Sequence, residues 1–341
     1  MKKHPVRDYI VSVLNGMAWG LFSSLLIGLI IKQIGVIAGI KELVTFGNVA
    51  QRLMGPAIGV GVAYIIKAPA LVVMSSVAVG AIGAGSMQFG ADGAVTMAIG
   101  EPAGAFVAAL LGAEIGKRIA GKTPVDIVLV PMVTILVGGV VGLFVAPYIS
   151  GLMNGLGEII NQATELRPIP MGIIVSVMMG MILTAPISSA ALAISLNLSG
   201  LAAGAATVGC CCNMIGFAVI SHKDNGIGGS IAQGIGTSML QVPNIVKKPI
   251  IWLPAIISSA ILGPVSTSIG MVSNASGAGM GTSGLVGQFA MVDVMGAGPE
   301  VLFQIGLMHF IFPAILSYAV YAVMVRMGWI KAGDLKLEMQ N

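Results

Sequence analysis

The sequence has little charge: Asp, Glu, Lys and Arg together make up 9% of its 341 residues. A soluble domain typically carries about 25% of these residues, because its surface faces water. Hydrophobic types account for 56% of the chain, so too few polar side chains exist to cover a water-facing surface. These proportions exclude an ordinary soluble enzyme and a disordered chain, and they predict a protein surrounded mostly by lipid.

Cysteine is also scarce, and the three cysteines are consecutive at positions 210, 211 and 212. Adjacent cysteines rarely bridge one another, so no disulfide framework is expected. The nearest histidine, His222, lies ten residues beyond them, so neither a metal site nor another cofactor is expected. We predict that the cysteines act as small, polarizable side chains that pack a helix interface.

No basic run is interleaved with aromatic residues, which excludes nucleic acid as a partner despite a net charge of +4. The basic residues instead stand at the ends of apolar runs, as they do on the cytoplasmic side of membrane proteins. Both termini are therefore predicted to be cytoplasmic, and a loop at 150–167, which carries Glu158 and Glu165, is predicted to face outward. The basic clusters lie at Lys2, Lys3 and Arg7, at Lys117, Arg118 and Lys122, at Lys247 and Lys248, and at Arg326, Lys331 and Lys336.

Long apolar runs are abundant, and each could cross a hydrocarbon core of about 30 Å. Two longer tracts are broken, 54–85 at Lys67-Ala68-Pro69 and 187–221 near Asn197 and Gly200, and a segment at 40–53 is expected to lie on the membrane surface. The runs of spanning length are 10–31, 125–149, 168–186, 250–269 and 301–325. The sequence thus predicts an all-α polytopic membrane protein with about 8–10 transmembrane helices.

Glycine-rich stretches at 79–104, 226–236 and 276–298 are too short or too polar to span alone. Such stretches indicate broken helices and re-entrant loops, or close packing of helices through small residues. We expect one membrane-embedded domain over 1–341, in which a weak internal duplication would give halves 1–165 and 166–341. Local likenesses around Lys117 and Lys247 suggest that duplication.

One candidate site is a carboxylate in the first glycine-rich stretch. Pro102 suits the first turn of a helix, because its missing N–H would be unpaired there anyway. Glu101 would then stand at the start of a half-helix and point into a cavity, where a carboxylate accepts hydroxyl groups well. The alternative is a plain helix cap. Asp92 flanks the same stretch.

A second candidate is the polar segment from His222 to Asn244. Ser230, Gln233, Thr237 and Gln241 recur at spacings of three and four, which predicts one polar helical face along a water-filled cavity. The opening residues, from Ser221 to Gly226, could equally form a solvated turn. A third candidate is the hydroxyl- and amide-rich loop from Asn274 to Gly284, which lacks the Lys and the spacing of a nucleotide-binding loop.

These motifs resemble the membrane-embedded IIC subunits of the bacterial sugar phosphotransferase system, and among them the branch that includes the perfringolysin-regulator-like proteins. Gly100-Glu101-Pro102 is similar to the Gly-Ile-Thr-Glu-Pro motif of glucose-type IIC proteins, with Gly100 in place of the Thr. More specific to the branch are the motifs His222-Lys223-Asp224-Asn225-Gly226, Gly236-Thr237-Ser238-Met239-Leu240-Gln241-Val242-Pro243-Asn244 and Gly277-Ala278-Gly279-Met280-Gly281-Thr282-Ser283-Gly284-Leu285-Val286-Gly287.

The resemblance implies a homodimeric permease of the bacterial cytoplasmic membrane that carries a sugar by an elevator-like movement. A separate IIB phosphocarrier would phosphorylate the sugar, because only fifteen residues follow Arg326 and this chain shows no pairing of a nucleophile with a base. The residues expected to bind the solute are Gly100, Glu101, Pro102, His222, Asp224, Asn225, Gln233, Thr237, Ser238, Gln241, Asn244, Asn274, Thr282 and Ser283.

Two other functions stay open from the sequence. The protein could be a membrane sensor that binds a solute without carrying it. It could also be an ion-coupled transporter that uses Asp92, Glu101 or His309 as its proton or cation site. For His309, which lies within the last apolar run, a buried neutral side chain with one hydrogen bond is the alternative to a proton carrier.

Overall fold

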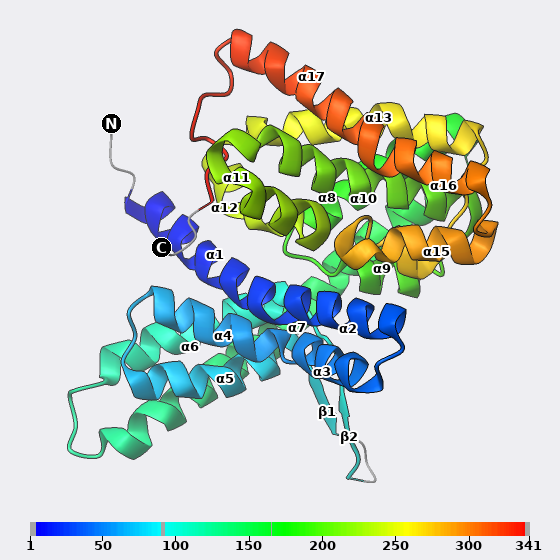
Figure 1. Cartoon of the computed structure of the whole chain (residues 1–341). Coiled ribbons are helices and arrows are strands. Elements are labelled where there is room, and N and C mark those ends of the chain that lie inside the picture. Colours follow the sequence, from blue (N-terminus) through cyan, green and yellow to red (C-terminus); the bar gives the residue numbers. More distant parts are fainter. Residues whose placement is uncertain (1–4, 90–92, 165, 338–341) are drawn as a thin grey trace. The chain divides into compact units, whose positions relative to one another are not determined.

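The computed structural model describes residues 5–89, 93–164 and 166–337 of the chain. It divides into two compact units, Met1–Leu152 and Met153–Asn341, and each is described here by itself. The described residues are mostly helical, which confirms the predicted all-α membrane class (Figure 1). The boundary between the units falls inside a long helix, between Leu152 and Met153. The internal duplication suggested by the sequence would place the boundary between residues 165 and 166.

The first unit contains the helices α1 (Pro5–Leu21), α2 (Ile27–Ala38), α3 (Lys41–Arg52), α4 (Met54–Ile65), α5 (Ala70–Ala84) and α6 (Pro102–Ile119), and the π-helical segment η1 (Phe22–Leu26) joins α1 to α2. It also contains the part of α7 (Asp126–Thr164) up to Leu152, and the rest of α7 belongs to the second unit. The tract 54–85 forms a helical hairpin, as predicted, because the chain turns at Lys67, whose φ is +56°, and at Pro69, which starts α5. The segment 40–53 forms the separate helix α3, which leaves Phe46 and Val49 exposed.

Glycines let the helices of this unit approach closely, which confirms the packing interpretation for many of them. A Cβ on Gly59 would overlap the backbone of Ser76, and one on Gly80 would overlap that of Gly55, so α4 and α5 touch main chain to main chain. Gly16 and Gly61 bring α1 and α4 together in the same way. Small residues are the usual means of such contact in membranes, where no hydrophobic effect drives helices together.

The glycine-rich stretch 79–104 differs from the prediction. The helix α5 runs on to Ala84, and the strands β1 (Met87–Phe89) and β2 (Val95–Met97) then form an antiparallel hairpin in which Met87 pairs with Met97. This hairpin projects from the helices of its unit (Figure 1). Asp92 lies outside the described residues.

The second unit is built around α10 (Gly200–Ile220), most of whose side chains are buried. The helices α8 (Pro168–Thr184), α13 (Leu253–Ser268) and α17 (Phe312–Arg326) pack against it. The other helices are α9 (Ser189–Ser195), α11 (His222–Ile231), α12 (Val242–Lys247), α14 (Ala275–Ala278), α15 (Val286–Met295) and α16 (Pro299–Ile305). Short π- or 3₁₀-helical segments connect them: η2 (Ala232–Gly236), η3 (Ser238–Gln241), η4 (Pro249–Trp252), η5 (Ser283–Leu285) and η6 (Gly306–Ile311).

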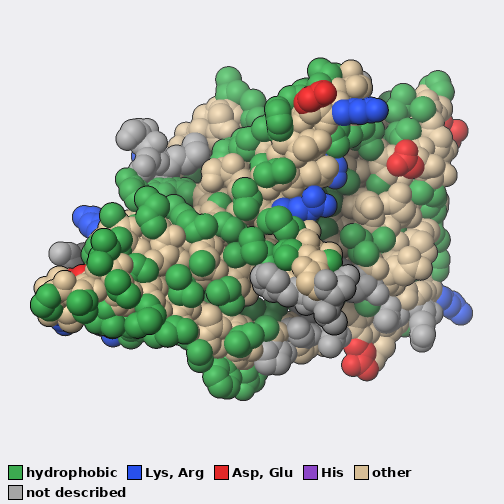
Figure 2. All heavy atoms as spheres, turned by 90° about the horizontal axis from the view of Figure 1, so that it is seen from below, with side chains coloured by type: hydrophobic (Ala, Val, Ile, Leu, Met, Phe, Trp, Pro, Cys, Tyr) green, Lys and Arg blue, Asp and Glu red, His purple; other side chains and the backbone are tan. Residues whose placement is uncertain are grey.

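Among the described residues, five helical stretches are long and apolar enough to cross a membrane: Tyr9–Val36, Asp126–Ala146, Gly200–Ile220, Pro249–Ser268 and Pro299–Arg326. They confirm four of the predicted runs and the break within 187–221, while the run 168–186 forms the shorter apolar helix α8. On α7, large apolar side chains such as Leu143 and Phe144 are 73% and 70% exposed, as expected of a lipid-facing helix. Hydrophobic side chains also cover much of the face in Figure 2.

The predicted loop at 150–167 is wrong for most of its length. The helix α7 continues without interruption to Thr164 and contains 39 residues, which corresponds to about 58 Å. Gly151 and Gly155 in this part have no atom near the place of a Cβ, so they neither break the helix nor form a close contact.

Candidate functional site

Two irregular parts of the second unit approach the middle of α10 from its opposite ends. We call residues 222–247 broken segment 1 and residues 271–295 broken segment 2. Irregular backbone at membrane depth is stable only where protein or a water-filled cavity satisfies its polar groups. The bonding partners of the two segments therefore identify the polar interior of the unit.

Broken segment 1 leaves the C-terminal end of α10, folds back along it and returns to the same end. Ser230 Oγ donates to the Ala218 carbonyl (3.0 Å), and the Gln233 amide donates to Ser221 Oγ (2.8 Å). The chain turns at Gly226, whose φ is +64°, and becomes extended at Thr237. Its tip, residues 234–238, reaches the level of Ile215 on α10.

Broken segment 2 starts at the N-terminal end of α10, where the Ser273 N–H donates to the Gly200 carbonyl (3.2 Å). It advances along α10 until Thr282 Oγ1 contacts Met214 Sδ (3.4 Å). The helix α15 then leads back, and the sulfur of Met295 accepts from the N–H of Val272 (3.4 Å). Both ends of this segment are thus at one end of α10, which confirms the prediction of a re-entrant element within 276–298.

The two tips bind each other directly. Thr282 Oγ1 donates to the Gly234 carbonyl (2.5 Å), and Ser283 Oγ donates to the Gly236 carbonyl (2.8 Å). Gly281, whose φ is +54°, packs so closely on Cys210 and Cys211 that a Cβ there would overlap them. The structure therefore brings together the two loops that the sequence marked as candidates.

Beside the tips lies a cluster of buried polar side chains, which we call the polar centre: Thr184, Asn213, Ser238, Trp252 and Ser259. Thr184 Oγ1 lies 2.7 Å from Ser238 Oγ and 3.1 Å from Asn213 Oδ1, and Trp252 Nε1 donates to the same Asn213 oxygen (2.8 Å). The Asn213 amide nitrogen lies 3.4 Å from Ser259 Oγ. All but Trp252, which is half-buried, are fully buried.

The chemistry of the polar centre is that of neutral hydroxyls, an amide and an indole N–H. Such groups exchange hydrogen bonds readily with the hydroxyls of an uncharged solute. None of the five side chains carries a formal charge at neutral pH, so nothing in the cluster itself would balance the charge of an ion held there. The arrangement therefore suits a neutral polyhydroxylated molecule better than an ion.

Sequence reasoning identified Ser238, Thr282 and Ser283 here but missed Thr184, Asn213, Trp252 and Ser259. An asparagine within the apolar run of α10 was the available signal, because an amide in hydrocarbon needs partners. Thr184 and Trp252 carry no comparable signal, since each stands near the end of an apolar run where such residues are common.

The predicted polar stripe does not follow one helix. The helix α11 ends at Ile231, a π-helical turn follows, and Thr237 has an extended backbone, so Gln233 and Gln241 meet across a fold in the chain. The side-chain amide nitrogen of Gln241 donates to the side-chain oxygen Oε1 of Gln233 (2.8 Å). The side chains of Gln233, Thr237 and Gln241 are buried, and protein atoms take the place that the prediction gave to water.

Several other predicted site residues contact a different part of the chain. Asp224, Asn225, Gln241 and Asn244 all hydrogen-bond to the backbone of residues 333–337. His222 is exposed and its Nδ1 lies 2.9 Å from Ser230 Oγ. Asn274 caps the short helix α14 by accepting from the N–H groups of Ser276 and Gly277.

His309 and the cysteines lie within the helices of the second unit. His309 is fully buried, and its Nδ1 lies 2.9 Å from the amide nitrogen of Gln288. Cys210, Cys211 and Cys212 are buried on α10 as free thiols, which agrees with a packing role. Among the described residues, no group of three or more His, Cys, Asp and Glu side chains is placed to hold a metal ion.

Gly100, Glu101 and Pro102 belong to the first unit. Pro102 begins α6 as predicted, and Gly100 has a φ of +80° and lies against the Ala84 carbonyl. Within the described residues 101–119, the Glu101 carboxylate makes no capping hydrogen bond to α6. It is half-buried and lines a cavity of about 990 Å³ whose other side chains are apolar except for Ser75.

Comparison with known families gives one match. A family model described as "Phosphotransferase system, EIIC" matches residues 11–337, which is almost the whole chain. No curated protein and no solved structure matches it. The apolar spanning helices, the broken segments and this match agree, and the chain belongs to the EIIC family of the phosphotransferase system, whose members are its multi-pass membrane permease components.

Proposed function

We propose that this permease carries a sugar across the bacterial cytoplasmic membrane and that a separate IIB protein phosphorylates the sugar. The observation that carries the proposal is the meeting of two broken segments beside a buried, uncharged polar centre. Transporters commonly bind their solutes where discontinuous helices meet near the middle of the membrane. The three glycine- and amide-rich motifs support assignment to the branch that includes the perfringolysin-regulator-like proteins.

In this proposal the sugar replaces hydrogen bonds that the protein makes with itself. When the tips separate, the hydroxyls of Thr282 and Ser283 lose the Gly234 and Gly236 carbonyls, and the hydroxyls of Thr184 and Ser238 lose one another. Sugar hydroxyls can take their place, so the exchange leaves few buried groups unsatisfied. We further propose that the second unit moves as a block in an elevator-like cycle and that the permease is a homodimer.

Uptake by proteoliposomes tests the function. We expect labelled sugar to accumulate as its phosphate only when the IIB protein and a phosphoryl donor are present on the cytoplasmic side. Uptake at the same rate without them, driven by an ion gradient, would instead establish the ion-coupled alternative. Specific sugar binding without any uptake would favour the sensor.

The proposed topology gives a separate prediction. If both termini are cytoplasmic, Glu158 near the end of α7 faces outward, because four basic clusters occupy the other side. A cysteine in place of Glu158 should react with a membrane-impermeant maleimide in intact cells, whereas the buried native cysteines should not. Reaction only after permeabilisation would reverse the orientation.

A further prediction concerns Glu101, which we propose as a sugar ligand on the strength of the resemblance of Gly100-Glu101-Pro102 to the IIC motif. Glu101→Gln keeps the size of the side chain and removes its charge, and a charged acceptor makes stronger hydrogen bonds to hydroxyls. We expect sugar binding to weaken by about 1–3 kcal/mol, or about 5- to 150-fold, while the melting temperature stays unchanged. Unchanged affinity in the folded variant would remove Glu101 from the site and leave the polar centre untouched.

A further inference from the structure

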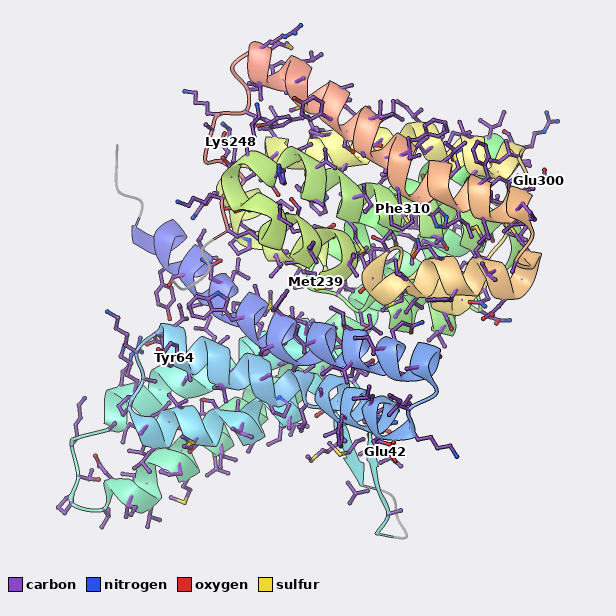
Figure 3. The ribbon with its side chains drawn as sticks, in the orientation of Figure 1. Glu42, Tyr64, Met239, Lys248, Glu300 and Phe310 are labelled. Atoms are coloured by element: carbon purple, nitrogen blue, oxygen red, sulfur yellow. The ribbon has the colours of Figure 1, made fainter. Side chains whose placement is uncertain are left out.

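The polypeptide after α17 turns back and runs along broken segment 1. We call its residues 331–337 the C-terminal clasp; in Figure 3, Lys248 is labelled beside the coil that follows α17. The clasp forms no strand or helix of its own, yet its backbone is bonded along its length. Leu335 is 1% exposed and packs in one apolar cluster with Phe217 of α10 and Ile251 of η4, while Leu337 is also largely buried.

The tip of broken segment 1 divides it into a first limb, residues 222–233, and a second limb, residues 239–247. The first limb holds the clasp through two adjacent side chains. The Asp224 carboxylate accepts from the backbone N–H of Gly333 (3.1 Å) and of Leu335 (3.3 Å). Asn225 donates its amide N–H to the Leu335 carbonyl (2.8 Å) and accepts from the Leu337 N–H (2.7 Å). One amide side chain thus pairs with the backbone on both sides of residue 336, as a neighbouring β-strand would.

The second limb binds the same few residues. Gln241 donates to the Leu335 carbonyl (3.0 Å), and Asn244 donates to the Lys336 carbonyl (3.0 Å). Just beyond this limb, Lys248 Nζ forms an ion pair with Asp334 (2.6 Å). The Leu335 carbonyl therefore accepts from both limbs at once, from Asn225 on one and from Gln241 on the other.

We propose that Asp224, Asn225, Gln241, Asn244 and Lys248 form a peptide-binding site whose ligand is the chain's own C-terminal clasp. Four of the five residues bind peptide backbone, and the fifth forms an ion pair with a clasp side chain. Because the clasp crosslinks both limbs, it keeps broken segment 1 folded and its tip against Thr282 and Ser283. Release of the clasp frees this tip, whichever solute the permease carries.

The clasp also occupies two residues, Gln241 and Asn244, that the sequence predicted to bind the sugar. The Gln241 amide nitrogen donates to the side-chain oxygen of Gln233 and to the clasp. The Asn244 amide nitrogen donates to the side-chain oxygen of Gln241 and to the clasp. Both N–H groups of each amide are therefore used. While the clasp is bound, these amides have no N–H left to offer a sugar. Among the polar residues of 222–244, Ser238 therefore belongs to the polar centre, whereas Asp224, Asn225, Gln241 and Asn244 bind the chain's own end.

Hydrogen–deuterium exchange of the full-length protein in detergent tests the proposal. In a variant that ends at Ile330, the amides of residues 222–247 should exchange about tenfold faster or more, because several crosslinking hydrogen bonds are lost together. Exchange in α8 and the first unit should be unchanged. A synthetic peptide of residues 331–337, added in excess, should restore slow exchange, and the same peptide with Leu335→Asp should not.

Point variants keep the test valid if the truncated chain folds poorly. Asn225→Leu removes two bonds to the clasp and should accelerate exchange in 222–247, whereas Lys223→Ala, an exposed neighbour, should not. A variant that ends at Leu337 retains every residue that makes these bonds and should behave as the full chain. Unchanged exchange in both the Ile330 truncation and Asn225→Leu would overturn the clasp, and because no sugar is present, that result would leave the proposed transport function standing.

Discussion

Asn213→Leu is expected to reduce sugar uptake about 5- to 150-fold. The Asn213 side-chain oxygen accepts from both Trp252 and Thr184. Thr184 keeps the Gly180 carbonyl and Ser238 as partners, so leucine leaves the indole N–H of Trp252 without its partner inside the membrane. A buried group that loses its partner costs about 1–3 kcal/mol, which gives the stated range when the loss falls on the solute-bound state. Uptake by cells that express equal amounts of each variant measures the effect.

Thr207→Val is the matched control for this prediction. Thr207 is also fully buried on α10, but its hydroxyl donates to the Ala203 carbonyl of its own helix, away from the polar centre. This variant should transport nearly as well as the unmodified chain. Thr184→Val serves as a milder test, because it keeps the shape of the side chain and removes only the hydroxyl that joins Ser238 to Asn213. If Asn213→Leu and Thr207→Val transport equally well, the polar centre is not the solute site.

Gly209→Ala is expected to give the largest loss of stability among single methyl additions to α10. A Cβ at Gly209 would lie at less than van der Waals distance from three backbone atoms of Ser176, and backbone cannot turn aside as a flexible side chain can. The helices α8 and α10 must therefore move apart. Overpacking of this kind typically costs about 1–3 kcal/mol and occasionally more. A clear fall in the melting temperature of the purified protein is the expected result.

Gly139→Ala provides the comparison for Gly209. Gly139 also lies within a helix, α7, but the nearest atom to its Cβ position is a side-chain methyl of Ile82 at an ordinary distance of 3.8 Å. Alanine favours helix by up to about 1 kcal/mol over glycine, so this variant should melt at the same temperature or higher. Equal melting temperatures for both variants would show that the contact between α8 and α10 is looser than described.

The spans and their breaks could be predicted because hydropathy and helix-breaking residues act locally. The run of apolar residues at 250–269 became a spanning helix. The chain broke at Lys67-Ala68-Pro69, where the proline disfavours helical backbone at the residue before it. The extension of α7 to Thr164 could not be predicted, because Gly151 and Gly155 resemble loop residues until the rest of the helix holds them in place.

The candidate site was predictable only in part, because side-chain spacing does not report tertiary partners. The spacing of Gln233, Thr237 and Gln241 is that of a helical face, yet the chain folds at Thr237 so that the two glutamines bind each other. The β-hairpin was missed for a similar reason, since strands of three residues leave almost no alternating pattern. Asn213 gained its role only from Trp252 and Thr184, which are distant from it in sequence.

The most direct test of the central claim is sugar binding to the purified permease, measured by isothermal titration. The sugar is the one that the uptake experiments identify, and the proteins are the unmodified chain, Thr184→Val and Thr207→Val. We expect saturable binding to the unmodified chain, at least about tenfold weaker binding to Thr184→Val and nearly unchanged binding to Thr207→Val. Full affinity in a folded Thr184→Val protein would contradict the assignment of the sugar site to the polar centre.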